Sequence, residues 1–465
     1  MRFPLSYFLL VSGTMALGSC VFGPDPGSPD YEVPVSIRND SYPHGTSFGD
    51  KSWKSVFKDS TLRELIERAL KNNPDLVAAT YRIEQARQQA LASRADWYPQ
   101  VGGSGGATSN LLSLNADQVA TGADRTYESF NLTTSLSWEV DMWGRIRRSN
   151  EAARARFLQA GYQKDAIQTS LVASVATAYI QLKNLDERLQ ISRRTEKSRA
   201  ASLELVTARS EGGVSSDLEV GQAKALLSQA RVAIPITEQA ITEKENEIRY
   251  LIGEFPGSVV RGGSLAGLVS SLKIKGGLPS ELLNRRPDLA AADQAFQAAV
   301  ADIGVAEALR LPSLSLTGSG GVVSQGLGSL LEGKSGAYSI GPDLAGPIFD
   351  GGRNKARAEA TRAAAGESLA NYDAAAKQAF REASNALNAH VKTGQISAQQ
   401  EELVQTNRRV AEVANDRFEG GASSYLEVLD AERNLFTSEL EFADSQRDRL
   451  LAVVQSYRAL GGGWK

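Results

Sequence analysis

The sequence contains one stretch twice: RSEGGVSSDLEVGQA at residues 209–223 and RFEGGASSYLEVLDA at residues 417–431. Ten of the fifteen positions are identical, at an offset of 208 residues. Two further pairs occur in the same order, NPDL at 73–76 with RPDL at 286–289, and WGR at 143–145 with GGR at 351–353. Similarity at a nearly fixed offset over this length predicts a chain built from two copies of one unit.

A long segment without proline precedes each copy of the repeated stretch. The segment Ile146–Arg209 has 64 residues, which would be about 96 Å long as a helix. The segment Gly352–Phe418 is similarly long and also lacks proline. Shorter helices are expected at 215–251 and 423–460 after the glycine pairs, and at 74–96 and 287–310 earlier in each copy. The two short helices of a copy together match the length of its long helix. The lengths therefore predict a wall in which each long helix lies beside two stacked short ones.

Strict alternation of polar and apolar residues predicts strands between these helices. In Tyr127–Asp141 the apolar positions are Phe130, Leu132, Leu136 and Trp138, and the polar positions between them are Asn131, Thr133, Ser135 and Ser137. The strands are expected at about 98–114 and 127–142 in the first copy, and at about 312–324 and 336–350 in the second. Four strands do not close a barrel, because small closed barrels have about eight. We therefore expect copies of the chain to close a ring, with eight strands from two copies or twelve from three.

Composition excludes several classes of function. Fifty-one Lys and Arg against 54 Asp and Glu give a net charge of −3, so no basic footprint for nucleic acid is expected. One cysteine and two histidines leave no intrachain disulfide and little basis for a metal site or cofactor. Mean hydropathy is −0.26, and no stretch after residue 20 is apolar enough for a transmembrane helix. We predict a protein that is not an enzyme.

The N-terminus predicts a secreted lipoprotein. Residues 1–19 have one charge, Arg2, and an apolar segment that is too short to span a bilayer, as in a signal peptide. The following Leu17-Gly18-Ser19-Cys20 is similar to a bacterial lipobox, in which the cysteine is acylated after cleavage. Val21, in place of aspartate, favours the outer membrane over retention in the inner membrane. The alternative is a chance cysteine after an ordinary signal peptide.

Further motifs resemble a known family across nearly the whole mature chain. They are GPD at 23–25, RRPDL at 285–289, LPSLSL at 311–316, PIFDGG at 347–352, LEVLDA at 426–431 and ALGGGW at 459–464. In these motifs the chain resembles the outer-membrane efflux factor family, the TolC-like channels, in its NodT/OprM-type lipoprotein branch. One departure is local: the family usually runs from the GPD motif directly into tyrosine, whereas here Pro26–Pro29 intervenes before Asp30-Tyr31.

The resemblance implies a mixed fold. Long antiparallel helices form an α-barrel, and each chain adds four strands to a twelve-stranded transmembrane β-barrel of a homotrimer. The domains expected on this basis are a signal peptide (1–19), a lipidated N-terminal and equatorial segment (20–72), the first repeat (73–252), an equatorial linker (253–286), the second repeat (287–460) and a C-terminal tail (461–465).

The resemblance also implies site residues at the two repeated turns. Gly212-Gly213-Val214 and Gly420-Gly421-Ala422 would lie at the periplasmic tip and contact a periplasmic adaptor, also called a membrane fusion protein. The alternative is that both turns are only helix C-caps. Ser215 or Ser216, and Ser423 or Ser424, are expected to cap the returning helices.

Glu427, Asp430 and Arg433 are spaced to share one helical face. The resemblance implies that they form a closed periplasmic gate, with six carboxylates in three copies. The alternative is a solvated charged face. The first copy has Gln222 at the position of Asp430, so the gate is expected in the second copy alone. Some relatives latch the gate with a tyrosine and an arginine, and here Phe418 and Ser423 occupy those positions.

The implied function is passive transport of drugs or toxic compounds through an outer-membrane exit duct of a tripartite efflux system. Its partners would be the adaptor, an inner-membrane pump of the RND type and outer-membrane lipid. The alternatives are an exit duct for type I secretion and a structural lipoprotein that does not conduct.

Overall fold

The computed structural model describes residues 21–29, 31–34, 36, 47–113, 125–263, 265, 268, 274, 277 and 279–464. The predicted signal peptide and Cys20 lie outside the described residues. Two compact units comprise Met1–Pro29, Ile83–Gln159 and Ala292–Tyr372 in the first, and Asp30–Arg82, Ala160–Ala291 and Asp373–Lys465 in the second. Among the helices of the described residues, none combines the length and the apolar character that crossing a bilayer requires.

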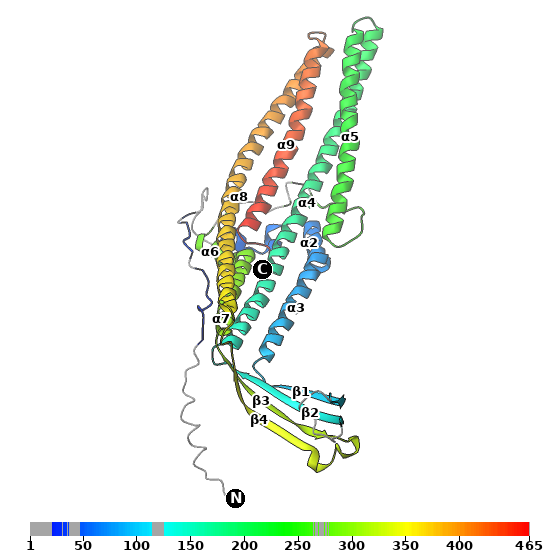
Figure 1. Cartoon of the computed structure of the whole chain (residues 1–465). Coiled ribbons are helices and arrows are strands. Elements are labelled where there is room, and N and C mark those ends of the chain that lie inside the picture. The colour runs from blue at the N-terminus through cyan, green and yellow to red at the C-terminus, as the bar shows by residue number, and fades with distance from the viewer. Residues whose placement is uncertain are drawn as a thin grey trace. The chain divides into compact units, whose positions relative to one another are not determined.

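The first unit contains one antiparallel sheet, in the order β1-β2-β3-β4 (Figure 1). Its strands are β1 (Gln100–Leu111), β2 (Thr126–Val140), β3 (Ser313–Ser324) and β4 (Gly336–Ala345). The two copies of the repeat meet at its centre, where Leu132 of β2 lies opposite Val322 of β3 and Trp138 opposite Leu316. The strand pairs of the two copies thus form one continuous sheet, with β1 and β4 at its edges.

This sheet has no core of its own. Nearly every residue of β1 and β4 is exposed, and Leu132 in the centre of β2 is 56% exposed. The hydroxyl groups of Ser104 and Thr133 lie 2.9 Å apart on the face opposite Leu132. A single layer with one apolar face, one polar face and two unpaired edges is not a stable structure by itself.

Helical packing in the first unit holds the N-terminal segment in place. Arg148 of α4 (Arg145–Glu211) is 2% exposed, and its guanidinium donates to the carbonyl groups of Phe22 and Gly23 and to the Asp25 carboxylate. Gly23 has φ +88°, and a Cβ there would collide with the backbone of Gly304 in α7 (Pro287–Ala308). Residues 22–25 are therefore fixed against α4 and α7.

The second unit contains the main hydrophobic core. It is built around α2 (Ser60–Asn72), the middle of α4 and the C-terminal part of α9 (Tyr425–Ala459), and it also receives residues from α1 (Trp53–Val56) and α6 (Pro279–Arg285). Tyr457 lies near its centre and donates from its hydroxyl to the carbonyl of Lys51 at 2.5 Å. A Cβ on Gly462 would enter the ring of Tyr457, which explains the glycine-rich tail.

Two long helical hairpins extend from this core (Figure 1). In the first, α5 (Asp217–Leu251) follows α4, and in the second, α9 follows α8 (Arg353–Glu419). The lengths match between the copies, since α4 and α8 each have 67 residues and α5 and α9 each have 35. The helices that precede the strands, α3 (Pro74–Ala95) and α7, each have 22. The predicted fold class is confirmed: the described residues are mainly helical and include four strands, and the chain is internally duplicated.

Candidate functional site

The turn between α4 and α5 is a helix cap that requires glycine. Gly213 has φ +74°, a conformation that residues with a Cβ adopt at a cost. Its N–H donates to the carbonyl of Ser210 at 2.9 Å, and the N–H of Val214 donates to the carbonyl of Arg209 at 2.8 Å. This pair of bonds is the Schellman motif, which satisfies carbonyl groups at the helix end. Val214 is 69% exposed at the end of the hairpin.

The turn between α8 and α9 repeats this geometry. Gly421 has φ +71°. Its N–H donates to the backbone carbonyl of Phe418 at 3.0 Å, and the N–H of Ala422 donates to the backbone carbonyl of Arg417 at 2.8 Å. Gly420 and Gly421 are both exposed. The two copies therefore end in the same turn, and each presents a short exposed loop at the tip of its hairpin.

The helices that return from these turns begin differently. Ser216 caps α5 through a capping box: its side chain accepts from the N–H of Glu219, whose carboxylate accepts from the N–H of Ser216 at 2.9 Å. Ser424 occupies the cap position of α9, but its side chain makes no capping hydrogen bond. Glu427, the counterpart of Glu219, is thus free of the capping role.

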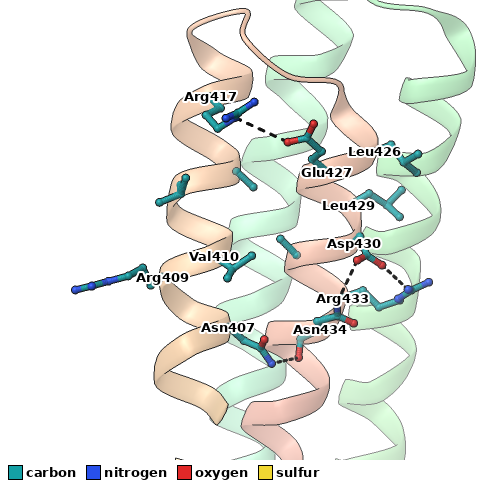
Figure 2. Close-up of a pocket in the computed structure, with 13 residues that line it drawn as sticks. Asn407, Arg409, Val410, Arg417, Leu426, Glu427, Leu429, Asp430, Arg433 and Asn434 are labelled. Atoms are coloured by element: carbon teal, nitrogen blue, oxygen red, sulfur yellow. Dashed lines mark hydrogen bonds and ion pairs between the residues drawn. The ribbon is translucent and has the colours of Figure 1, made fainter. Parts of the chain in front are cut away.

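The predicted gate residues lie together on the exposed face of α9 (Figure 2). Arg433 pairs with Asp430 at 2.5 Å, and the Asn434 side chain donates to the other oxygen of Asp430 at 3.2 Å. Glu427 lies 3.9 Å from Arg417 of α8. All four charged side chains are more than half exposed, so each pair contributes about 0–1 kcal/mol within one chain.

A groove of about 860 Å³ runs beside these charges (Figure 2). Its lining residues are Asn407, Arg409, Val410, Val413, Ala414, Arg417, Leu426, Glu427, Leu429, Asp430, Ala431, Arg433 and Asn434. Val410, Val413 and Leu426 are 50–60% exposed in it. The groove therefore combines both signs of charge with an apolar surface that the chain itself does not cover.

Phe418 and Ser423 lie at the two positions where the resemblance implies a latch. Phe418 is 5% exposed and packs against Tyr425 with 5.3 Å between ring centroids. Arg209 of the other hairpin lies over the Phe418 ring at 4.6 Å and donates to its carbonyl at 3.1 Å. Ser423 has a buried hydroxyl without a hydrogen-bond partner among the described residues.

Sequence reasoning missed Arg417 and Asn434. Both were visible in the pattern, since Arg417 opens the repeated stretch and Asn434 is four residues after Asp430 on the same helical face. Arg417 contacts Glu427 because the turn between them reverses the chain.

Comparison with known proteins identifies the family. A model of the family described as outer membrane efflux protein matches residues 65–254 and 278–462, most of the chain. The chain belongs to this family. As a member of the outer membrane efflux protein family, it is an efflux channel of the outer membrane, as the sequence predicted.

Individual relatives match over nearly their full length. The toluene efflux pump outer membrane protein TtgF of Pseudomonas putida is 32% identical, with 99% of this chain and 97% of TtgF covered. The cation efflux system protein CusC of Escherichia coli is also 32% identical, with 97% of each chain covered. The solved structure of the outer-membrane channel OprN has a TM-score of 0.90 at 30% identity, and the match covers 96% of this chain and all of that chain.

Proposed function

We propose that three copies of this efflux channel assemble into the passive exit duct of a tripartite efflux system. The observation that carries the proposal is the four-stranded sheet, whose edges β1 and β4 are unpaired and whose faces are exposed. Joining β4 of one copy to β1 of the next gives a closed ring without edges. Three copies supply twelve strands, whereas two would supply eight and enclose an interior filled by side chains.

The alternating strand residues support a barrel in a bilayer. Leu132 and Trp138 would face lipid, and Asn131 and Thr133 would face water in the pore. Backbone groups at the edges would all be paired on closure, which a membrane environment demands. The paired hairpins of three copies would continue the duct as a periplasmic tunnel of helices.

The two exposed turns support contact with a periplasmic adaptor. Gly212-Gly213-Val214 and Gly420-Gly421-Ala422 have little side-chain bulk, so the backbone of a partner can approach closely. Val214 adds an exposed apolar contact at the end of the first hairpin. An inner-membrane pump of the RND type, coupled through the adaptor, would supply the energy, and the duct itself needs neither catalysis nor a cofactor.

Glu427, Asp430 and Arg433 would form the gate. In a ring of three, six carboxylates on one face of α9 would come together at the axis, where they would repel one another unless cations or arginines compensate them. The Asp430–Arg433 and Glu427–Arg417 pairs supply such compensation in each chain. Closure would therefore depend on charged residues whose ion pairs within one chain are weak.

Acylation of Cys20 would anchor the protein to the inner leaflet of the outer membrane. The docking of residues 22–25 on α4 and α7 supports this role, because it fixes the chain directly after the cysteine. Acyl chains add membrane affinity for each buried methylene, and several chains together anchor firmly.

The relatives favour small toxic molecules as cargo over proteins exported by type I secretion. One is named for toluene efflux and another for cation efflux, at equal identity to this chain. That equality assigns the cargo to a class, toxic small molecules, without choosing between solvents and cations.

Single-channel recording of the purified protein in a planar bilayer tests the proposal. We expect rare, small openings for the wild type and a conductance several times larger for the double variant E427A/D430A, because its gate has lost its charged ring. A protein that never conducts, even with both residues changed, is a structural lipoprotein and contradicts the proposal.

A further inference from the structure

Two buried side chains of opposite charge lie where the two hairpins pack together, close to the gate. Arg199 of α4 is 2% exposed and Glu432 of α9 is 8% exposed. The Glu432 carboxylate accepts from the Ser202 hydroxyl at 3.2 Å, and Arg199 donates from Nη1 to the carbonyl of Leu226 in α5 at 2.7 Å. The guanidinium also lies over the ring of Phe436, 4.9 Å from its centroid.

The hydrogen bonds of this pair are incomplete. Nε and Nη2 of Arg199 are buried and have no hydrogen-bond partner among the described residues. Burial raises the pKa of Glu432 and lowers the pKa of Arg199, although each attracts the other and Ser202 and Asn415 favour the ionised carboxylate. Burial thus disfavours the ionised forms of both Glu432 and Arg199. A movement that lets water reach these side chains would remove this cost.

The geometry of α9 connects this pair to the gate. Asp430 and Arg433 are exposed on one side of the helix, whereas Glu432 is buried. At about 100° per residue, Glu432 points about 200° away from Asp430. A rotation or shift of α9 against α4 therefore moves the gate residues and changes the burial of Glu432 at the same time.

The pair is not a product of the duplication. At the offset of 208 residues, Arg199 corresponds to Asn407 and Glu432 corresponds to Lys224. Lys224 is exposed, and Asn407 lines the groove beside the gate. The buried charges therefore belong only to the contact between α4 and the helix that carries the gate.

We propose that Arg199 and Glu432 are positioning residues for the gate, whose buried charges set how readily α9 leaves its packed arrangement against α4. This inference rests on the proposed channel function. Removing one partner leaves the other charge buried without compensation, so the packed arrangement becomes less stable and the gate opens more often. Removing both charges relieves that cost, so the two substitutions should compensate each other.

Single-channel recording at neutral pH on a double-mutant cycle tests the inference. The variants are R199M, E432Q, R199M/E432Q and the matched control K224Q, which changes one charge at the corresponding exposed position of the other hairpin. We expect each single variant to raise the open probability about tenfold. The double variant should return to within about threefold of the wild type, and K224Q should not differ from it.

Several outcomes would overturn the inference. One is an unchanged open probability in both single variants, and another is a double variant that opens as often as the sum of the single effects predicts. A lower melting temperature with unchanged gating would make the pair structural only. If R199M is not recovered folded, E432Q, the double variant and K224Q still decide. If neither the wild type nor E427A/D430A conducts, the channel function itself is rejected. If the wild type conducts but R199M, E432Q and the double variant all open as often as it does, only this inference is rejected.

Discussion

At the scale of residues, buried charged side chains contribute more to the stability of the single chain than exposed ones do. Asp430 and Arg433 form a short ion pair, but both are more than half exposed, so solvent weakens their attraction. Arg148 and Arg199 are each 2% exposed and depend on the few partners that the fold supplies. Substitution of a buried charged residue should therefore reduce the stability of the single chain more than substitution of a residue of the proposed gate.

Glu432 should make the stability of the hairpins depend on pH. Burial raises its pKa above the ordinary value of 4.5, against the opposing effects of Ser202, Arg199 and Asn415, so the folded protein retains this proton at a pH where the unfolded chain has lost it. The contribution of Glu432 to the free energy of unfolding should be greatest below pH 4.5 and should fall as the pH rises through the raised pKa.

Thermal unfolding of the purified protein in detergent, followed by helical circular dichroism at pH 4.5 and 7.5, measures this effect. We expect the wild type to lose more melting temperature, or to gain less, between pH 4.5 and pH 7.5 than E432Q does. K224Q should retain the response of the wild type. Identical pH dependence in wild type and E432Q would show that Glu432 does not titrate as its burial implies.

Arg148 should hold the N-terminal segment. In R148M the carbonyl groups of Phe22 and Gly23 and the Asp25 carboxylate lose their buried donor. Losing hydrogen bonds to a buried charged group costs about 2–3 kcal/mol, so the amide of Phe22, which donates to the carbonyl of Trp143 at 3.2 Å, should exchange about thirtyfold faster or more. R154M, which changes an exposed arginine of the same helix, is the control, and equal exchange in both variants would contradict this role.

At the scale of elements, the two hairpins differ where α5 and α9 begin. Ser216 and Glu219 form a complete capping box, whereas the side chain of Ser424 caps nothing. An effective N-cap contributes about 1 kcal/mol to the helix it begins. S216A should therefore destabilise the first turn of α5 by about 1 kcal/mol, and S424A should change α9 little.

Hydrogen exchange at the two tips measures this difference. Amides of residues 217–221 should lose about fivefold in protection in S216A. Those of residues 425–429 should stay within about twofold of the wild type in S424A. Equal losses at both tips would mean that the two turns are capped alike in solution.

The elements could be predicted from the sequence because their signals are local. The glycine pairs, the absence of proline in the long helices and the alternation in Tyr127–Asp141 each depend on neighbouring residues alone. The contacts of Glu432 with Ser202 and of Arg148 with Asp25 depend on how segments distant in sequence are oriented against each other. Periodicity identifies an amphipathic face, but it does not specify which charge of that face is buried.

At the scale of the whole molecule, the unpaired edges β1 and β4 predict that further copies of the chain join the sheet. Closure with twelve strands requires three chains, so native mass spectrometry in detergent should give three times the mass of the acylated chain. Two chains would give a barrel of eight strands with a filled interior, and a dimeric mass would contradict the duct.

The capping box of the first hairpin also has an evolutionary consequence. After a segment is duplicated, every position exists twice, and selection can maintain the original role in one copy while the other diverges. Glu219 still begins its helix, whereas Glu427 has been released from that task and stands among the charges beside the groove. Duplication thus offers a route by which a glutamate that caps a helix in one copy becomes available for the proposed gate in the other.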